Sequence, residues 1–126
     1  NVLKAGGNAI DAAVAMAFAL AVTHPFAGNL GGGGFMLIRL AGGEEVGLDF
    51  REMAPAEATP DMFLEKDNTV NNEKATFGYL VAAVPGTVKG LETAWQKYGS
   101  LPWSDLIQPS IHLARQGIYL NKYDAA

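Results

Sequence analysis

Residues 35–51 read FMLIRLAGGEEVGLDFR. Two runs that contain bulky apolar residues are joined here by a Gly-Gly turn, and this pattern predicts a β-hairpin. Successive side chains of a strand point to opposite faces, so Leu48 and Phe50 share one face while Asp49 and Arg51 share the other. The second strand is therefore expected to end with a guanidinium that points away from the core side.

Four consecutive glycines, residues 31–34, precede the hairpin. A nucleotide-binding loop is disfavoured, because the dinucleotide fingerprint places a strand before its glycines and a helix after them, and here the order is reversed. The triphosphate-binding version also needs a Lys-Ser/Thr pair, which does not follow these glycines. The missing side chains instead leave room for another chain segment, or a substrate, to lie against the backbone.

A buried, alanine-rich helix is expected upstream, over residues 9–22, where Asp11 is the single polar residue. Asn8 is a favourable N-cap, and the residue before Pro25 is pushed out of the helical conformation. The run is shorter than the roughly 18 residues that a membrane span requires. A helix of this length that is apolar on every side indicates burial in a protein core. Asp11 at its edge also disfavours a signal peptide.

Downstream of the hairpin the sequence predicts a short helix and a loop. Thr59 is a good N-cap, and Pro60 suits the first position of a helix. Residues 65–74 are polar and predict a surface loop, and residues 78–84 predict a strand or extended segment.

Two further helices are expected near the C-terminus. The first opens at residues 85–87 and runs to about Tyr98, and the second begins at residues 101–105 and ends at Gly117. Pro109 is expected to break or kink the second helix.

Few residues in the chain suggest catalysis. Trp95 and Trp103 are expected to anchor the core. His112 lies on an apolar stripe and is expected to be a core histidine, whereas His24 before Pro25 is equally consistent with a turn. None of the serines has a histidine and a carboxylate at motif spacing.

The composition excludes several classes of protein. Of the 126 residues, 49% are apolar and 17% are charged, which indicates one compact domain or part of one. The net charge of -4 gives no overall attraction to nucleic acid or anionic lipid. Without cysteine there is no thiol nucleophile or thiolate metal site, and two distant histidines do not indicate a zinc site.

The chain begins with NVLK at residues 1–4, which read as the last turn of a helix and are not preceded by an initiator methionine. We therefore expect a piece of a longer protein.

Five segments carry a family resemblance, in this order: GGNAIDAA at 6–13, THP at 23–25 with GNLGGGGFML at 28–37, DFREMAP at 49–55, VPGTV at 84–88, and Pro109 with LARQG at 113–117. Together they resemble the early part of the large subunit of γ-glutamyltransferase, also called glutathione hydrolase. The likeness is closest to the bacterial branch of that family.

The resemblance implies an α+β fold that is part of the αββα sandwich of the N-terminal-nucleophile hydrolases. Residues 1–126 would be a fragment of a single large-subunit domain, truncated at both ends, with a buried alanine-rich helix, a hairpin and C-terminal helices. In this family a precursor cuts itself into two subunits, so the small subunit of the same precursor is the expected partner.

The chemistry that the resemblance implies lies outside these residues. The nucleophile is the threonine at the new N-terminus of the small subunit, which forms a γ-glutamyl ester and passes it to water or to an amino acid or peptide. No catalytic residue is expected in this chain, and no cofactor or metal. Bacterial relatives are typically exported, so the periplasm or the cell exterior is the expected location.

One substrate-binding residue carries over by position: Arg51. In the family this arginine grips the α-carboxylate of the glutamyl group, and a planar guanidinium matches a carboxylate bidentately. From the residues alone, an ion pair of Arg51 with Asp49 or Glu52 remains open. Two other functions also remain open: a cephalosporin acylase that cleaves a glutaryl group, and a non-catalytic structural module.

Overall fold

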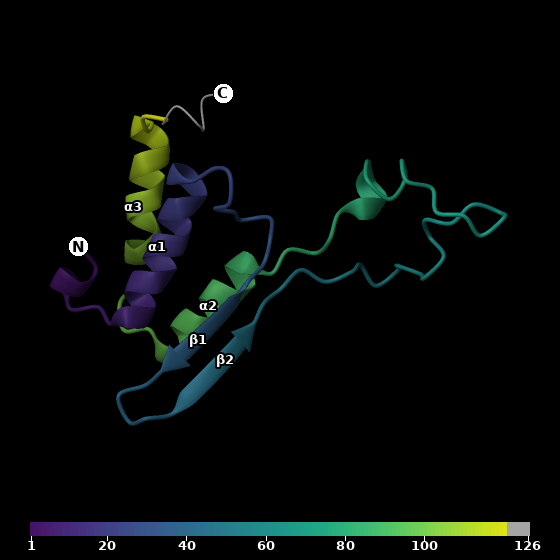
Figure 1. Ribbon diagram of the computed structural model, residues 1–126. Coiled ribbons are helices and arrows are strands. Elements are labelled where there is room, and N and C mark those ends of the chain that lie inside the picture. The colour runs from purple at the N-terminus through teal and green to yellow at the C-terminus, as the bar shows by residue number, and fades with distance from the viewer. Residues whose placement is uncertain (121–126) are drawn as a thin grey trace.

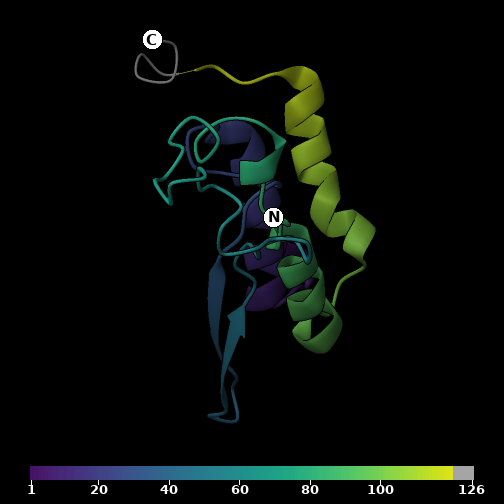
Figure 2. The same cartoon turned by 90° about the vertical axis from the view of Figure 1, so that its right-hand side faces the viewer.

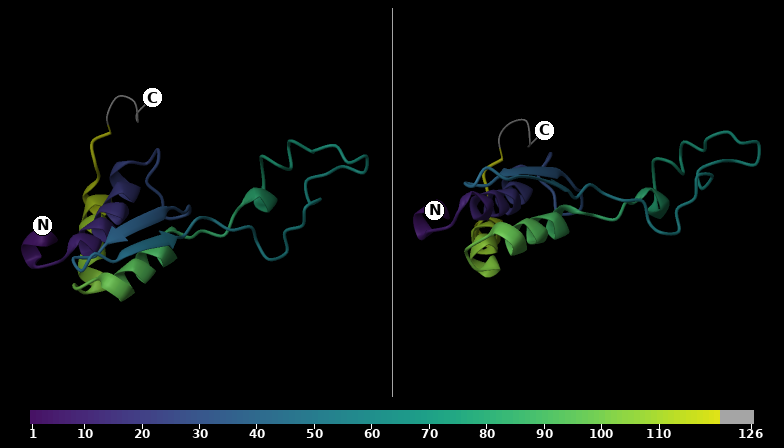
Figure 3. Two further views of the ribbon diagram at one scale, coloured as in Figure 1. Left: turned by 60° about the horizontal axis from the view of Figure 1, so that its bottom comes forward. Right: turned by 90° about the horizontal axis from the view of Figure 1, so that it is seen from below.

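A computed structural model describes residues 1–120 of the chain (Figure 1). The hairpin lies on one side of helix α1, and helices α2 and α3 lie on the other (Figures 2 and 3). Residues 54–83 extend away from these elements (Figure 1). In chain order the elements are η1 (Leu3–Ala5), α1 (Ala9–Thr23), β1 (Phe35–Arg39), β2 (Glu45–Asp49), η2 (Tyr79–Val81), α2 (Thr87–Tyr98) and α3 (Trp103–Gln116).

The predicted hairpin is confirmed, and its register decides which side chains face the helices. The strands are antiparallel, with Met36 opposite Leu48 and Ile38 opposite Val46. Ile38 is buried, and Met36 packs against the core. Gly43 has a φ of +91°, a left-handed conformation that glycine adopts without strain, and it closes the turn.

The core is formed by the three α-helices. Trp95 and Trp103 are partly buried against it, with ring centroids 5.2 Å apart, and the Phe18 ring meets Trp103 edge-to-face at 5.4 Å. Both tryptophans therefore anchor the core, as the sequence predicts. The buried residues of this cluster are Val14, Ala15, Phe18, Leu91 and Leu106.

Helix α1 has the predicted capped start and ends before His24. Its buried face carries Asp11, Val14, Ala15 and Phe18, whereas Met16 on another face is 60% exposed. Within the described residues, the predicted burial of this helix thus holds along one face.

Helix α3 differs from its prediction in two ways. It continues through Pro109, so the predicted break does not occur, and the alternative of a kink stays a prediction. Leu106 and Ser110 on either side of the proline are buried, and packing against α1 offsets the hydrogen bond that proline removes. His112 is exposed, so its prediction as a core histidine is wrong. His112 lies two residues after Ser110, which is about 200° around the helix, so it is on the face opposite the buried one.

Residues 54–83 form turns in place of the predicted short helix. The Met62 N–H donates to the Thr59 carbonyl and the Leu64 N–H to the Asp61 carbonyl, which form two overlapping turns and no helix. Because this segment lies away from the helical core, so short a helix lacks the packing that stabilises α1, α2 and α3. Within 78–84, η2 is a single 3-10 turn, and at the base of the segment Val84 pairs with Met53 in an antiparallel bridge.

A buried carboxylate joins the start of α1 to the connection between α2 and α3. Asp11 is fully buried, and its Oδ2 accepts the Asn8 N–H at 2.8 Å and the Ser100 hydroxyl at 2.6 Å. Its Oδ1 accepts the N–H groups of Ser100 at 3.0 Å and Leu101 at 3.3 Å. Asn8 in turn accepts the Asp11 N–H at 3.0 Å and donates to the Tyr98 carbonyl at 2.7 Å.

These contacts set the ionisation of Asp11. Burial raises the pKa of its carboxyl, but the hydrogen bonds from Ser100, Asn8 and Leu101 outweigh burial, and the pKa lies below its ordinary value of 3.8. The ionised form is therefore the one that holds the junction together.

We expect Asp11→Ala to lower the free energy of unfolding by about 2–4 kcal/mol at pH 7, because a helix cap is lost and several donors lose their acceptor. A carboxyl whose pKa is lowered by folding contributes fully above its unfolded pKa and loses that contribution as pH falls through the folded value. The difference in free energy of unfolding between the native protein and the variant should thus shrink below about pH 3.8. Urea denaturation between pH 2 and pH 7, roughly the range in which carboxyls titrate, measures both effects.

The matched control is Asp105→Ala, since Asp105 is an exposed aspartate in the first turn of α3. Its loss should cost less than about 1 kcal/mol. Equal destabilisation by the two substitutions would contradict the role assigned to Asp11.

Candidate functional site

The glycine run lies directly against the chain that leaves β2. A Cβ at Gly33 would lie 2.6 Å from the Glu52 nitrogen and 2.7 Å from the Arg51 Cα. The Phe50 N–H donates to the Gly34 carbonyl at 3.0 Å. At Gly33 and Gly34 the prediction that the glycines make room for another chain segment is confirmed, and the segment is residues 50–52.

Helix α2 approaches the same segment from the other side. A Cβ at Gly90 would overlap the Cβ and Cγ of Phe50, and a Cβ at Gly86 would overlap the Phe50 carbonyl oxygen. Phe50 is therefore enclosed by glycines from two parts of the chain. This contact was not predicted from the sequence, although a glycine in the middle of an amphipathic helix is a signal of close packing.

Hydrogen bonds fasten the loop before β1 to the start of α2. Asn29 Oδ1 accepts the Gly32 N–H at 2.9 Å and the Thr87 hydroxyl at 2.7 Å. The Gly32 carbonyl accepts the N–H groups of Gly86 at 2.8 Å and Thr87 at 3.0 Å. The two segments that pack against residues 50–52, the loop before β1 and the start of α2, are thus hydrogen-bonded to each other.

Arg51 is exposed, as predicted, but it is not the end of the second strand. Strand β2 ends two residues earlier, at Asp49, whose side chain binds the Arg51 N–H. Its side chain is 73% exposed, and its Nε lies 3.9 Å from Glu52 Oε2. Asp49 does not pair with the guanidinium; its Oδ1 accepts the backbone N–H of Arg51 at 3.0 Å. Of the two ion pairs that the sequence left open, the structure has a long, exposed contact with Glu52, which contributes little to stability.

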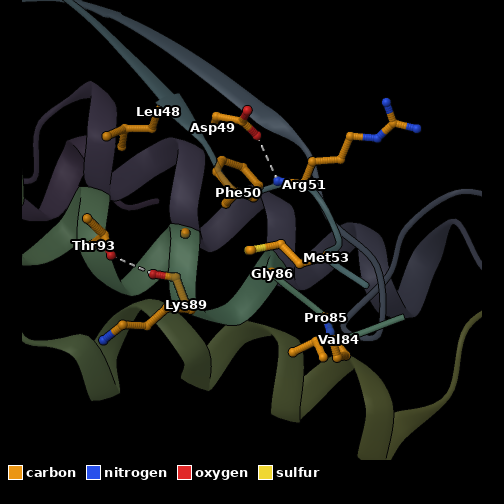
Figure 4. A pocket seen from close by; sticks show the side chains of 11 residues that line it. Leu48, Asp49, Phe50, Arg51, Met53, Val84, Pro85, Gly86, Lys89 and Thr93 are labelled. Carbon is orange, nitrogen blue, oxygen red and sulfur yellow. Dashed lines mark hydrogen bonds between the residues drawn. The ribbon is translucent and has the colours of Figure 1, made fainter. Parts of the chain in front are cut away.

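A hollow of about 270 Å³ lies beside this segment, between the end of β2 and α2. Its walls are mainly apolar and include Phe50, Met53 and Pro85. Figure 4 shows that the Arg51 guanidinium extends away from these side chains. The arginine therefore presents its charge to the space outside this hollow.

Two serines among residues 1–120 have their hydroxyls bonded to groups other than histidine. The hydroxyl of Ser100 donates to Asp11 and that of Ser110 to the Ile107 carbonyl, so neither is paired with a histidine. No cluster of metal-ligating side chains occurs among these residues. None of the helices in the same range has the length and apolar character needed to cross a membrane.

Comparison with known proteins identifies the family. A family model described as Gamma-glutamyltranspeptidase matches residues 1–126. The chain belongs to the γ-glutamyltranspeptidase family. The glutathione hydrolase proenzyme of Escherichia coli (strain K12) is 54% identical over 121 residues, which cover 96% of this chain and 21% of that relative. The chain thus spans about a fifth of the length of the curated relatives it matches.

Solved structures of γ-glutamyltranspeptidase relatives confirm the fold class. The Helicobacter pylori γ-glutamyltranspeptidase aligns with a TM-score of 0.93 at 56% identity, over 98% of this chain and 36% of that one. A cephalosporin acylase from Bacillus halodurans aligns with a TM-score of 0.86 at 33% identity, over 98% of this chain and 23% of that one. The three helices and the two-stranded sheet are part of the N-terminal-nucleophile hydrolase sandwich.

We expect Gly90→Ala to destabilise this γ-glutamyltranspeptidase segment by about 1–2 kcal/mol. Alanine favours a helix by about 1 kcal/mol over glycine, but here the added Cβ meets the root of the Phe50 side chain, and overpacking costs about 1–3 kcal/mol with further strain where the neighbour cannot yield. Thermal unfolding shows whether the substitution lowers or raises stability. Gly42→Ala is the control, because a Cβ at Gly42 meets nothing within 4 Å. A stabilising Gly90→Ala would contradict the close packing of Phe50 on α2.

Proposed function

We propose that the chain forms part of the large subunit of an enzyme that cleaves γ-glutamyl amide bonds, as in glutathione, and transfers the γ-glutamyl group to water or to an amino acid or peptide. Membership of the γ-glutamyltranspeptidase family supports this proposal. The relative from Escherichia coli is named a glutathione hydrolase proenzyme, and 54% identity makes a shared reaction the simplest inference.

The reaction proposed for the complete enzyme follows the family resemblance. The hydroxyl of a threonine at the head of the small subunit attacks the γ-carbonyl, its proton passes to a base, and the leaving amine departs with a proton. The resulting γ-glutamyl ester then reacts with water or with an acceptor amine. These residues supply no such nucleophile, so the segment alone is expected to be inactive. We propose an exported enzyme, in the periplasm or outside the cell.

The role proposed for this segment is recognition of the substrate's α-carboxylate by Arg51. The observation that carries it is the exposed guanidinium, which has one long contact with Glu52 and faces away from the apolar hollow. An exposed guanidinium without a close ion-pair partner, on a backbone held in place, is available to a ligand carboxylate. Guanidinium–carboxylate pairs are strong when they are bidentate.

The outer face of the hairpin supports a subunit of a larger enzyme over a self-standing module. Phe35 and Leu37 on this face are 67% and 90% exposed. Adjacent exposed apolar side chains on a sheet indicate a surface that other parts of a protein cover. We propose that the rest of the precursor covers it.

In the complete enzyme, Arg51→Ala should lower kcat/KM for γ-glutamyl-p-nitroanilide about 30-fold to several thousand-fold, which corresponds to about 2–5 kcal/mol. The substrate carboxylate would be left without its partner. Arg39→Ala is the matched control, because Arg39 is an exposed hairpin arginine that pairs with Glu45. An unchanged kcat/KM for Arg51→Ala would remove the assignment.

A cephalosporin acylase is the second candidate, supported by the aligned structure at 33% identity. The complete enzyme should hydrolyse γ-glutamyl-p-nitroanilide in preference to a glutaryl-cephalosporin, because the glutathione hydrolase relative is more similar, at 54% identity. Measuring kcat/KM for both substrates decides between them. Preference for the glutaryl compound would reverse the proposal.

A further inference from the structure

The backbone that carries Arg51 is held far more tightly than its side chain. Phe50 is hydrogen-bonded to Gly34 and packed on α2, the Arg51 Cα lies against Gly33, and the Arg51 N–H is bound by Asp49. Two residues later, Met53 pairs with Val84. The side chain of Arg51 remains 73% exposed.

We infer that Gly33 and Asp49 are positioning residues for Arg51 and set the affinity for the α-carboxylate of the substrate. This inference rests on the proposed role of Arg51. Neither residue is assigned contact with the substrate; each fixes the turn from which the guanidinium extends.

Gly33 acts through the absence of a side chain. The atoms that its Cβ would meet, at 2.6–2.7 Å, are backbone atoms of Phe50, Arg51 and Glu52, which cannot rotate aside as a flexible side chain does. Gly33 has no positive φ, so alanine fits its backbone conformation and the contact alone makes the substitution costly. A Cβ at this position must therefore shift the turn that carries Arg51.

Asp49 acts through a local hydrogen bond. As the last residue of β2, it turns its Oδ1 to the N–H of the residue two positions later, at 3.0 Å. An aspartate or asparagine side chain forms such a turn, and alanine does not. Asp49 is exposed in this segment, so its replacement leaves the core between the helices intact.

The first test compares two glycines of the same run in the complete, processed enzyme. We expect Gly33→Ala to raise KM for γ-glutamyl-p-nitroanilide roughly 10- to 100-fold, with a smaller change in kcat, because misplacement by about 1 Å has effects of that order. Gly31→Ala, whose Cβ meets nothing within 4 Å, should leave KM unchanged. Subunit processing and thermal unfolding of each variant report whether the fold is retained.

The second test uses Asp49 and remains decisive if Gly33→Ala does not fold. Asp49→Ala should raise KM about tenfold, a modest fraction of the effect that misplacement can have. Asp49→Asn, which keeps the acceptor, should recover most of that loss. If Asp49→Asn is as impaired as Asp49→Ala, the hydrogen bond is not the cause and the inference for Asp49 is overturned.

Double variants separate this inference from the proposed function. If Gly33 and Asp49 act through Arg51, neither substitution should change KM further in an Arg51→Ala background, since residues that act as a unit are not additive. Full additivity would overturn the positioning role while leaving the role of Arg51 intact. No effect of Arg51→Ala itself would instead overturn the proposed role of Arg51 in binding the substrate.

Discussion

The close approach of residues 50–52 to the glycines of two other segments is the constraint on which this part of the structure depends. Gly33 leaves no space for a Cβ beside the backbone of Arg51, and Gly90 leaves none beside Phe50. The loop before β1, the exit from β2 and helix α2 can meet only because these positions lack side chains. The same contact fixes the backbone of Arg51 while its guanidinium stays exposed.

A second junction holds the helices behind this contact. The Asp11 carboxylate closes the capping box of α1 with Asn8 and binds Ser100, so one side chain orients α1 relative to the chain between α2 and α3. Burial of this charge is tolerated because hydrogen bonds satisfy it from several directions. Since α2 carries Gly90, the orientation of the helices also bears on where Phe50 and Arg51 lie.

Much of the local structure follows from the sequence. The Asn8 cap and the Gly-Gly hairpin turn depend on backbone preferences of individual residues, and both are found where the pattern places them. Helix α2 also ends at Tyr98, as predicted. Strand alternation likewise predicts the exposure of Arg51, although β2 ends at Asp49 and Arg51 lies in the turn that follows. The functional role given to that arginine came from family resemblance, because an exposed arginine beside two acids does not by itself reveal a ligand.

Packing between distant segments was decided by the tertiary structure alone. The sequence indicated that something lies against the glycine run, but only the fold shows that it is residues 50–52 and that Gly90 completes the enclosure. The uninterrupted helix at Pro109 and the exposure of His112 also depend on which face of α3 meets α1. Propensity and periodicity describe a residue and its near neighbours, whereas these outcomes depend on the shape and spacing of surfaces brought together from positions far apart in the chain.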